Sequence, residues 1–207
     1  FIQNKALELS LFLSLPATLA LLIASEEITS SLFGYGSFDD LSVKNSANAL
    51  FYFALGLPAF SFIKIFSSFL FARHNTKIPF YFSVISVIIN IIISIYYFNK
   101  IGFIIIPMAT TISSWLNAIL LLIFLTNKKY YSINSIFLYS LIKISLSTAI
   151  TSYIFYNLIN FFSDNLSYNS EYKLVSIILL VIVTFIIYIL TSILTKAFKI
   201  SDIKLKY

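Results

Sequence analysis

The sequence predicts an all-α, polytopic membrane protein with six transmembrane helices. Hydrophobic residues make up 59% of its 207 residues and charged residues only 11%, and the mean hydropathy is +0.94. A soluble domain has an apolar share of about 45–50%. The long apolar runs lack the alternation of barrel strands, so helices, which satisfy their own backbone hydrogen bonds in lipid, are expected to cross the membrane.

Six apolar runs are separated by polar or charged residues. A run of about 20 residues can cross a hydrocarbon layer of about 30 Å as a helix. The expected spans are residues 7–25, 47–72, 78–98, 102–125, 136–162 and 174–197.

Basic residues differ in number between the two sets of helix ends. One set carries Lys5, Arg73, Lys77, Lys128, Lys129, Lys196, Lys199, Lys204 and Lys206, and the other carries only Lys44, Lys100 and Lys173. The positive-inside rule therefore predicts that both ends of this piece of chain lie in the cytoplasm.

Glycines and prolines indicate where the first two spans turn or bend. Residues 33–40 combine turn-forming glycines with two aspartates, whose carboxylates are expected to cap the second span. Pro16 lies inside the first span, and Gly56 and Pro58 lie inside the second. Each proline removes a helical hydrogen bond, so we expect a bend at Gly56 and Pro58. Such a bend suits a moving membrane protein, but it is also common in other membrane proteins.

Lys64 is a candidate functional residue because it lies in the middle of the apolar run 47–72. It is nine residues, or about 13 Å, from Arg73, and the run contains no Asp or Glu. An ammonium in hydrocarbon costs several kcal/mol or more, so we expect Lys64 to face a polar cavity that attracts phosphate or carboxylate. A neutral lysine or an unseen carboxylate partner is the structural alternative.

Polar residues recur at helical spacing within three of the spans. These stripes are Ser10, Ser14 and Thr18; Ser83, Ser86, Asn90 and Ser94; and Thr110, Ser114 and Asn117. Such stripes face neighbouring helices or water rather than lipid, so they either join helices by hydrogen bonds or line a cavity. Ser114 and Asn117 are our candidates, with Lys64, for residues that line a substrate cavity.

The sequence excludes several kinds of chemistry. It has no Cys and one His, so neither disulfides nor a metal site built from these residues is expected. It shows no Gly-rich phosphate loop, no Ser/His/Asp set and no paired acids, so we expect neither covalent catalysis nor ATP hydrolysis, and no cofactor. Transport against a gradient would then need an ion or the membrane potential. Because the chain begins at Phe1 without a visible signal peptide, we interpret it as the C-terminal piece of a longer protein.

Several motifs, in the same order and spacing, resemble the MurJ (MviN) family of lipid II flippases. They are Leu32-Phe33-Gly34-Tyr35-Gly36-Ser37-Phe38, Ala47-Asn48-Ala49-Leu50-Phe51-Tyr52, Gly56-Leu57-Pro58-Ala59-Phe60, Lys64, Phe71-Ala72-Arg73-His74-Asn75-Thr76-Lys77-Ile78-Pro79, Asn90, and Ser114-Trp115-Leu116-Asn117-Ala118. The likeness covers the first 130 residues well, and the last two spans fit by position and hydropathy.

The resemblance implies a member of the multidrug/oligosaccharidyl-lipid/polysaccharide exporter superfamily, whose fourteen helices form two lobes and two extra helices. Residues 1–130 would supply second-lobe helices, and residues 131–207 the two extra helices and a basic tail. Such a protein lies in the bacterial cytoplasmic (inner) membrane. It moves lipid II, an undecaprenyl-pyrophosphate-linked peptidoglycan precursor, by alternating access between its lobes, and the final two helices help form a groove for the lipid tail. Membrane lipids and cell-wall synthesis proteins are further expected partners, and nucleic acid is not.

Two positions depart from the family pattern. In the cytoplasmic motif formed by Arg73, Asn75, Thr76, Lys77 and Pro79, the family usually has Asp at the position of Asn75, so an ion pair made there is lost. Some members bind Na⁺ through an Asn, an Asp one turn later and a Thr of the next helix. Here Asn90 and Thr110 match, but Ser94 replaces the acid.

The substrate-binding arginines of the family belong to earlier helices, so this piece alone is not expected to flip lipid. Two alternatives stay open from the sequence: a flippase for O-antigen or another polysaccharide-linked lipid, and a membrane scaffold that recruits cell-wall enzymes without transporting.

Overall fold

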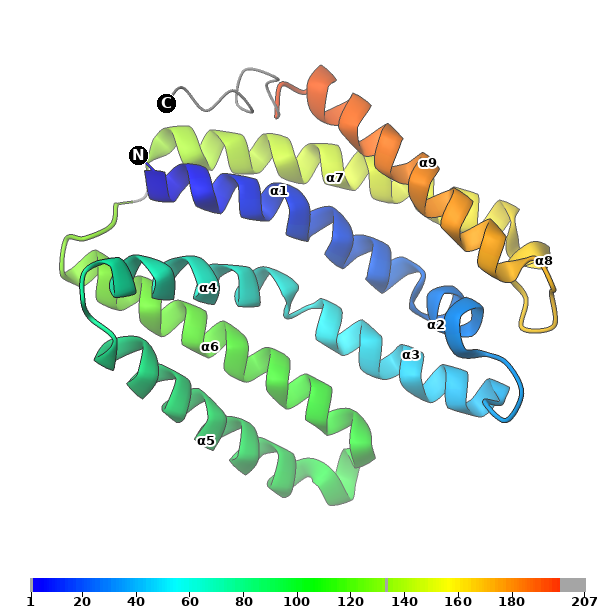
Figure 1. The fold of residues 1–207 in the computed structure, drawn as a ribbon, viewed down its shortest axis with the longest axis horizontal. Helices are drawn as coiled ribbons and strands as arrows, with labels where there is room; N and C mark the ends of the chain where they lie inside the picture. The colour runs from blue at the N-terminus through cyan, green and yellow to red at the C-terminus, as the bar shows by residue number, and fades with distance from the viewer. Residues whose placement is uncertain (1, 133, 198–207) are drawn as a thin grey trace. The chain divides into compact units, whose positions relative to one another are not determined.

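The computed structural model describes residues 2–132 and 134–197, and within these ranges the chain is helical and has no strands. The all-α prediction is therefore confirmed. The elements, labelled in Figure 1, are α1 (Ile2–Ile23), α2 (Ser25–Phe33), α3 (Asp40–Ala54), α4 (Leu57–Ala72), α5 (Lys77–Ile101), the 3₁₀ helix η1 (Gly102–Ile104), α6 (Ile105–Asn127), α7 (Ser135–Phe161), α8 (Ser163–Leu166) and α9 (Lys173–Leu194).

The six expected crossing segments are all present as helices in the described part of the chain. Gln3–Ile23, Lys77–Asn127, Ser135–Phe161 and Lys173–Leu194 are each long and apolar enough to cross a membrane, and α3 with α4 qualifies as a bent pair. Lys77–Asn127 has 51 residues and contains both α5 and α6. These two helices fold back on each other, and with 25 and 23 residues each is long enough to cross a membrane by itself.

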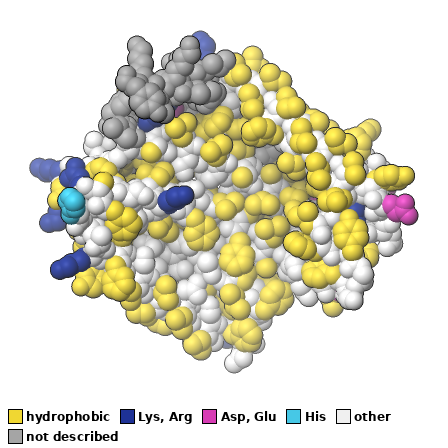
Figure 2. Space-filling model, viewed as in Figure 1, with side chains coloured by type: hydrophobic (Ala, Val, Ile, Leu, Met, Phe, Trp, Pro, Cys, Tyr) yellow, Lys and Arg dark blue, Asp and Glu magenta, His cyan; other side chains and the backbone are white. Residues whose placement is uncertain are grey.

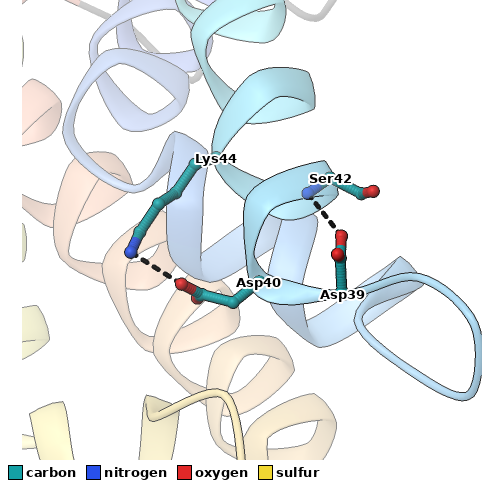
Figure 3. Close-up of polar contacts among 4 residues, drawn as sticks. All are labelled: Asp39, Asp40, Ser42 and Lys44. Atoms are coloured by element: carbon teal, nitrogen blue, oxygen red, sulfur yellow. Dashed lines mark hydrogen bonds and ion pairs between the residues drawn. The ribbon is translucent and has the colours of Figure 1, made fainter.

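The first connection differs from its expected form. The helix that begins the chain ends at Ile23 rather than at residue 25, and the separate nine-residue helix α2 follows a break at Ala24. In the following turn the Asp39 carboxylate accepts a hydrogen bond from the backbone N–H of Ser42 at 2.8 Å, and Asp40 pairs with Lys44 at 2.7 Å (Figure 3). The hydrogen bonds from Ser42 lower the pKa of Asp39. Asp39 thus caps α3, as its place before the helix predicts.

The helices form two compact units. Unit 1 contains the described residues of 1–14 and 49–137, and unit 2 contains those of 15–48 and 138–197. These units are groups of residues in contact and not the lobes implied by the family resemblance, so the division at residue 130 stays a prediction.

Unit 1 is built around the antiparallel pair α5 and α6, which lie side by side in Figure 1, with α4 packed on α6. The turn between the pair uses Gly102 with φ +76°, a conformation that glycine adopts without a steric penalty. The core of the unit contains Leu7, Phe66, Leu70, Leu121, Leu125 and Tyr131.

Unit 2 packs α2 and α8 against α9. Its core contains Ala24, Phe155, Ile159, Leu166, Ile177 and Leu180. Hydroxyl groups also join α7 to α9 and to the residue that follows it. Thr151 lies 3.1 Å from Thr191 of α9, and Ser147 lies 2.6 Å from Thr195, which ends that helix. Many large apolar side chains of both units remain exposed, and Figure 2 shows hydrophobic side chains over much of the visible face. This surface suits a protein surrounded by lipid.

Candidate functional site

The polar stripes of α5 and α6 face each other in unit 1. Asn117 donates to Ser83 at 3.4 Å, and Asn90 donates to Thr110 at 3.0 Å. From Ser83 to Asn90 the chain advances seven residues along α5, and from their partners Asn117 to Thr110 it goes back seven residues along α6. The same antiparallel register brings Ser86 opposite Ser114. The two stripes are therefore one feature, made of three polar layers.

A pocket of about 410 Å³ lies along these layers and α4. On α5 and α6 the lining is polar except for Val87, and on α4 it is apolar. The lining residues are Ser83, Ser86, Val87, Asn90, Thr110, Ser113, Ser114, Asn117, Phe60 and Ile63. Both interpretations of the stripes therefore hold in part, because the same side chains join helices and line a cavity.

Asn117 and Ser114, the two α6 residues expected to line a cavity, are both in this pocket. Asn117 is 6% exposed, and its Oδ1 has no hydrogen-bond partner in the described part of the chain. Ser114 is 7% exposed and donates to the Thr110 carbonyl at 2.7 Å. Contact with a substrate stays a prediction for both.

The candidate ion-site residues Asn90, Ser94 and Thr110 are also brought together. Ser94 donates to Asn90 Oδ1 at 3.5 Å, and the Asn90 amide donates to Thr110 Oγ1. These groups already bond one another and carry no charge. Among the described residues no three His, Cys, Asp or Glu side chains form a group that could hold a metal. The trio could therefore bind a cation only through uncharged oxygen atoms. Na⁺ binding there stays a prediction.

Lys64 lies on the exposed side of α4 and does not line the polar pocket. Within the described ranges it makes no hydrogen bond or ion pair. The structure therefore does not bring Lys64 together with Ser114 and Asn117, and its role in a substrate cavity stays a prediction.

The bend at Gly56 and Pro58 is stabilised by α6. The axes of α3 and α4 differ by 42° at the break. Thr111 donates to the Tyr52 carbonyl at 2.6 Å, and Trp115 Nε1 donates to the Leu55 carbonyl at 3.0 Å. These bonds satisfy backbone acceptors beside the break, where the helical pattern is interrupted. The sequence analysis missed this role of Thr111 and Trp115. Their four-residue spacing indicates only that both lie on one face of α6.

A Cβ atom at Gly56 would lie 3.0 Å from the Phe60 ring, 3.1 Å from Thr111 Oγ1 and 3.2 Å from the Phe53 carbonyl. The absence of a side chain at Gly56 therefore lets α6 approach the bend closely. That this bend contributes to function stays a prediction.

The motif from Arg73 to Pro79 forms the turn between α4 and α5. The Arg73 guanidinium lies 4.7 Å from the centre of the Phe69 ring and 4.1 Å from that of Tyr130. Asn75 Oδ1 accepts from the Ile78 N–H at 3.3 Å, so the amide caps α5 without the charge of the usual Asp. The remaining motif residues, Thr76, Lys77 and Pro79, line a second pocket of about 620 Å³ with Ser67, Phe71, Phe80, Tyr81 and Ser83.

Lys173 of unit 2 is a buried cation that the sequence analysis did not single out. It is 2% exposed, and its Nζ donates to the carbonyls of Gly34 and Tyr168, each at 2.7 Å. The rings of Tyr35 and Tyr168 lie 4.3 and 4.7 Å from the same atom. We call this arrangement the Lys173 cage. It connects the turn after α2 to the start of α9, and its partners are too distant in sequence to form a recognisable motif.

Apolar helical spans with neutral polar layers between two of them define a polytopic membrane protein. A family model described as lipid II flippase MurJ matches residues 2–177. The chain therefore belongs to the lipid II flippase MurJ family, as its motifs predict.

Individual relatives agree with this assignment. A probable lipid II flippase MurJ of Rhizobium meliloti is 40% identical over 120 residues, which cover 58% of this chain and 22% of that protein. The corresponding protein of Thermotoga maritima is 32% identical over 194 residues, which cover 94% of this chain and 37% of the relative. A solved structure of a lipid II flippase MurJ in an inward closed conformation matches with a TM-score of 0.73 and 27% identity, over 94% of this chain and 38% of that one. The chain thus spans less than two fifths of the length of these proteins.

Proposed function

We propose that this chain is the C-terminal part of a lipid II flippase, a transporter rather than an enzyme. The complete protein would move the undecaprenyl-pyrophosphate-linked peptidoglycan precursor across the bacterial cytoplasmic membrane by alternating access. The family match over residues 2–177 carries this proposal. The names of the relatives favour lipid II over an O-antigen lipid as the cargo.

The charge of unit 1 supports an anionic cargo. Its sequence has seven Lys or Arg residues and one acid, Glu8, which is paired with Lys5 at 3.6 Å. Lys64 is exposed on α4, within an apolar run that has no acid to neutralise it. We infer that its ammonium attracts the pyrophosphate in the complete protein, where desolvation strengthens the attraction between opposite charges.

We also propose that both ends of this piece face the cytoplasm. The support is the excess of basic residues at that set of helix ends, which the positive-inside rule assigns to the cytoplasmic side. The membrane potential or a Na⁺ gradient would then supply the energy for transport.

Complementation tests the proposed function. The full-length parent gene should rescue bacteria depleted of their own lipid II flippase, whereas the Lys64→Ala variant should rescue poorly because the pyrophosphate loses a cationic partner. Lys100→Ala, which removes an exposed lysine at the other set of ends, is the matched control and should rescue fully. Failure of a well-expressed parent would contradict the proposal. Full rescue by a membrane-inserted Lys64→Ala variant would instead contradict the inferred role of Lys64 in attracting the pyrophosphate.

A further inference from the structure

Lys173 and Lys196 indicate how α9 is placed in a membrane. The helix has 22 residues and is therefore about 33 Å long, close to the hydrocarbon thickness of about 30 Å. No charged residue lies between the two lysines. An uncharged run of this length fills the hydrocarbon layer when its ends lie at the two surfaces. Lys173 therefore lies at one surface of the membrane, whichever side that surface faces.

The end of α2 lies at the same level as Lys173. The Lys173 ammonium donates to the Gly34 carbonyl at 2.7 Å, and the Ser31 hydroxyl donates to the backbone carbonyl of Lys173 at 3.2 Å. Figure 1 shows α2 and α8 at this end of α9, which both of them contact. The last turn of α2 and the residues that follow it are therefore held at the membrane surface.

α2 buries hydroxyl side chains and exposes large apolar ones. Thr29, Ser30 and Ser31 are buried, whereas Leu32 is 51% and Phe33 60% exposed. A short helix surrounded by water would be expected to place these residues the other way round, because apolar surface in contact with water is unfavourable. The exposed end of α2 therefore indicates surroundings that are less polar than water.

Two tyrosines add aromatic rings at this level. Tyr172 directly precedes Lys173 and is 68% exposed, and Tyr35 is 49% exposed although its ring also covers the Lys173 ammonium. The Tyr35 hydroxyl donates to the Ser31 carbonyl at 2.9 Å. Aromatic side chains with a polar end gather where hydrocarbon meets water. Farther along the turn the exposed residues become polar, at Ser37 and Asp39.

We propose that Leu32, Phe33 and Tyr35, which we call the α2 corner, anchor the protein in the headgroup and upper acyl-chain region of one leaflet. The level of the corner beside Lys173 and its aromatic composition favour lipid as its partner over the remaining part of the complete protein. Insertion of the corner keeps the Lys173 cage at the membrane surface. The anchor requires neither a particular cargo nor a particular orientation, so it holds or fails independently of lipid transport.

Spin labels on the full-length parent protein test the proposal. The protein, freed of any native cysteine, is reconstituted in vesicles of phosphatidylethanolamine and phosphatidylglycerol. A nitroxide is attached through Phe33→Cys or, as the control in the polar part of the turn, through Ser37→Cys. Molecular oxygen concentrates in hydrocarbon, whereas a water-soluble nickel chelate does not enter it. Relative to Ser37, the ratio of oxygen to chelate collisions at Phe33 should be higher by about threefold or more, because apolar solutes partition out of water.

A second position and a second measurement keep the test decisive. Leu32→Cys repeats the labelling if the label at Phe33 prevents folding. Phe33→Trp adds a fluorophore whose emission phospholipids brominated near the top of the acyl chain should quench. The proposal is overturned if the label at the α2 corner meets the chelate as often as the label at Ser37 does, which would mean that water surrounds it. It is equally overturned if the label is shielded from both reagents and the added tryptophan is not quenched, because another part of the complete protein would then cover the corner.

Discussion

Lys64 and Lys173 show how differently one side chain can be used in two regions of this molecule. Lys64 lies at the centre of an apolar run, yet it is exposed on α4. Lys173 lies at the start of α9, where a lysine would be expected to reach water, yet it is 2% exposed and held by two carbonyls and two rings. The ammonium of Lys173 is used to hold unit 2 together, whereas that of Lys64 is free to meet a partner.

The comparison also shows what neutralises a buried charge. Unit 2 contains Glu26 and Glu27 on α2, but Lys173 bonds backbone carbonyls instead of either carboxylate. Carbonyl dipoles and aromatic faces can hold an ammonium without a countercharge. A lysine without an acid nearby is therefore no sign in itself of a substrate cavity.

Lys173→Met should destabilise the protein more than any other substitution considered. The substitution keeps the length of the side chain but removes both hydrogen bonds to the buried carbonyls of Gly34 and Tyr168. We expect the free energy of unfolding to fall by about 2–4 kcal/mol. The matched variant Lys64→Met should change it by less than about 0.5 kcal/mol, because that side chain is exposed. Thermal unfolding of the full-length protein in detergent measures both, and equal losses would refute the contrast.

Gly34→Ala tests how tightly the Lys173 cage is closed. A Cβ atom at Gly34 would lie 2.6 Å from the Ser30 carbonyl and 3.2 Å from Lys173 Nζ. Because a backbone atom must shift, we expect a loss of about 2–3 kcal/mol. Gly36→Ala is the control: its Cβ would meet nothing within 4 Å, so only the positive φ of +59° should cost about 1 kcal/mol. The same unfolding assay applies, and a smaller loss at Gly34 than at Gly36 would mean that the cage is loose.

Thr111→Val tests the support of the bend before α4, the helix that carries Lys64. Its hydroxyl bonds the Tyr52 carbonyl beside the bend that positions α4, so its loss should cost about 1–2 kcal/mol. Thr126→Val on the same helix is the control, because Thr126 bonds only carbonyls of its own helix, and it should cost less than about 0.5 kcal/mol. Melting temperatures of the two variants should differ accordingly. Similar values would show that the bend does not need this bond.

Glu27→Gln on α2, the helix that precedes Gly34 of the Lys173 cage, should change stability only slightly. Burial raises the pKa of Glu27, and repulsion from Glu26 adds to the increase. Since the folded-state pKa exceeds the unfolded one, ionised Glu27 destabilises the fold above both values and has no effect below both. The variant should thus be slightly more stable at pH 7.5, by less than about 0.5 kcal/mol after solvent screening. Unfolding at pH 3.5 provides the control, where the gain should vanish. An equal gain at both pH values would exclude charge as its cause.

The sequence predicted the polar stripe of α5 and that of α6 separately, without showing that the two stripes face each other. Their spacing assigned Ser83, Asn90, Thr110 and Asn117 to helix faces, because the helical period is a local property of the chain. That the two faces meet, layer against layer, needed the antiparallel packing of the pair. The separate helix α2 was missed for a related reason: its nine residues are too short and too polar to stand out as a periodic segment.

The helical, membrane-crossing character of this chain follows from its sequence alone, because helices satisfy the backbone hydrogen bonds of a long apolar run in lipid. The sequence also located the bend at Gly56 and Pro58 and the family to which the chain belongs. The packing of the helices was needed to show that Lys173 is buried, that Thr111 and Trp115 support the bend, and that Asn117 Oδ1 has no partner among the described residues. These contacts join residues 34 to 139 positions apart in the chain, and at such separations packing rather than local pattern selects the partner.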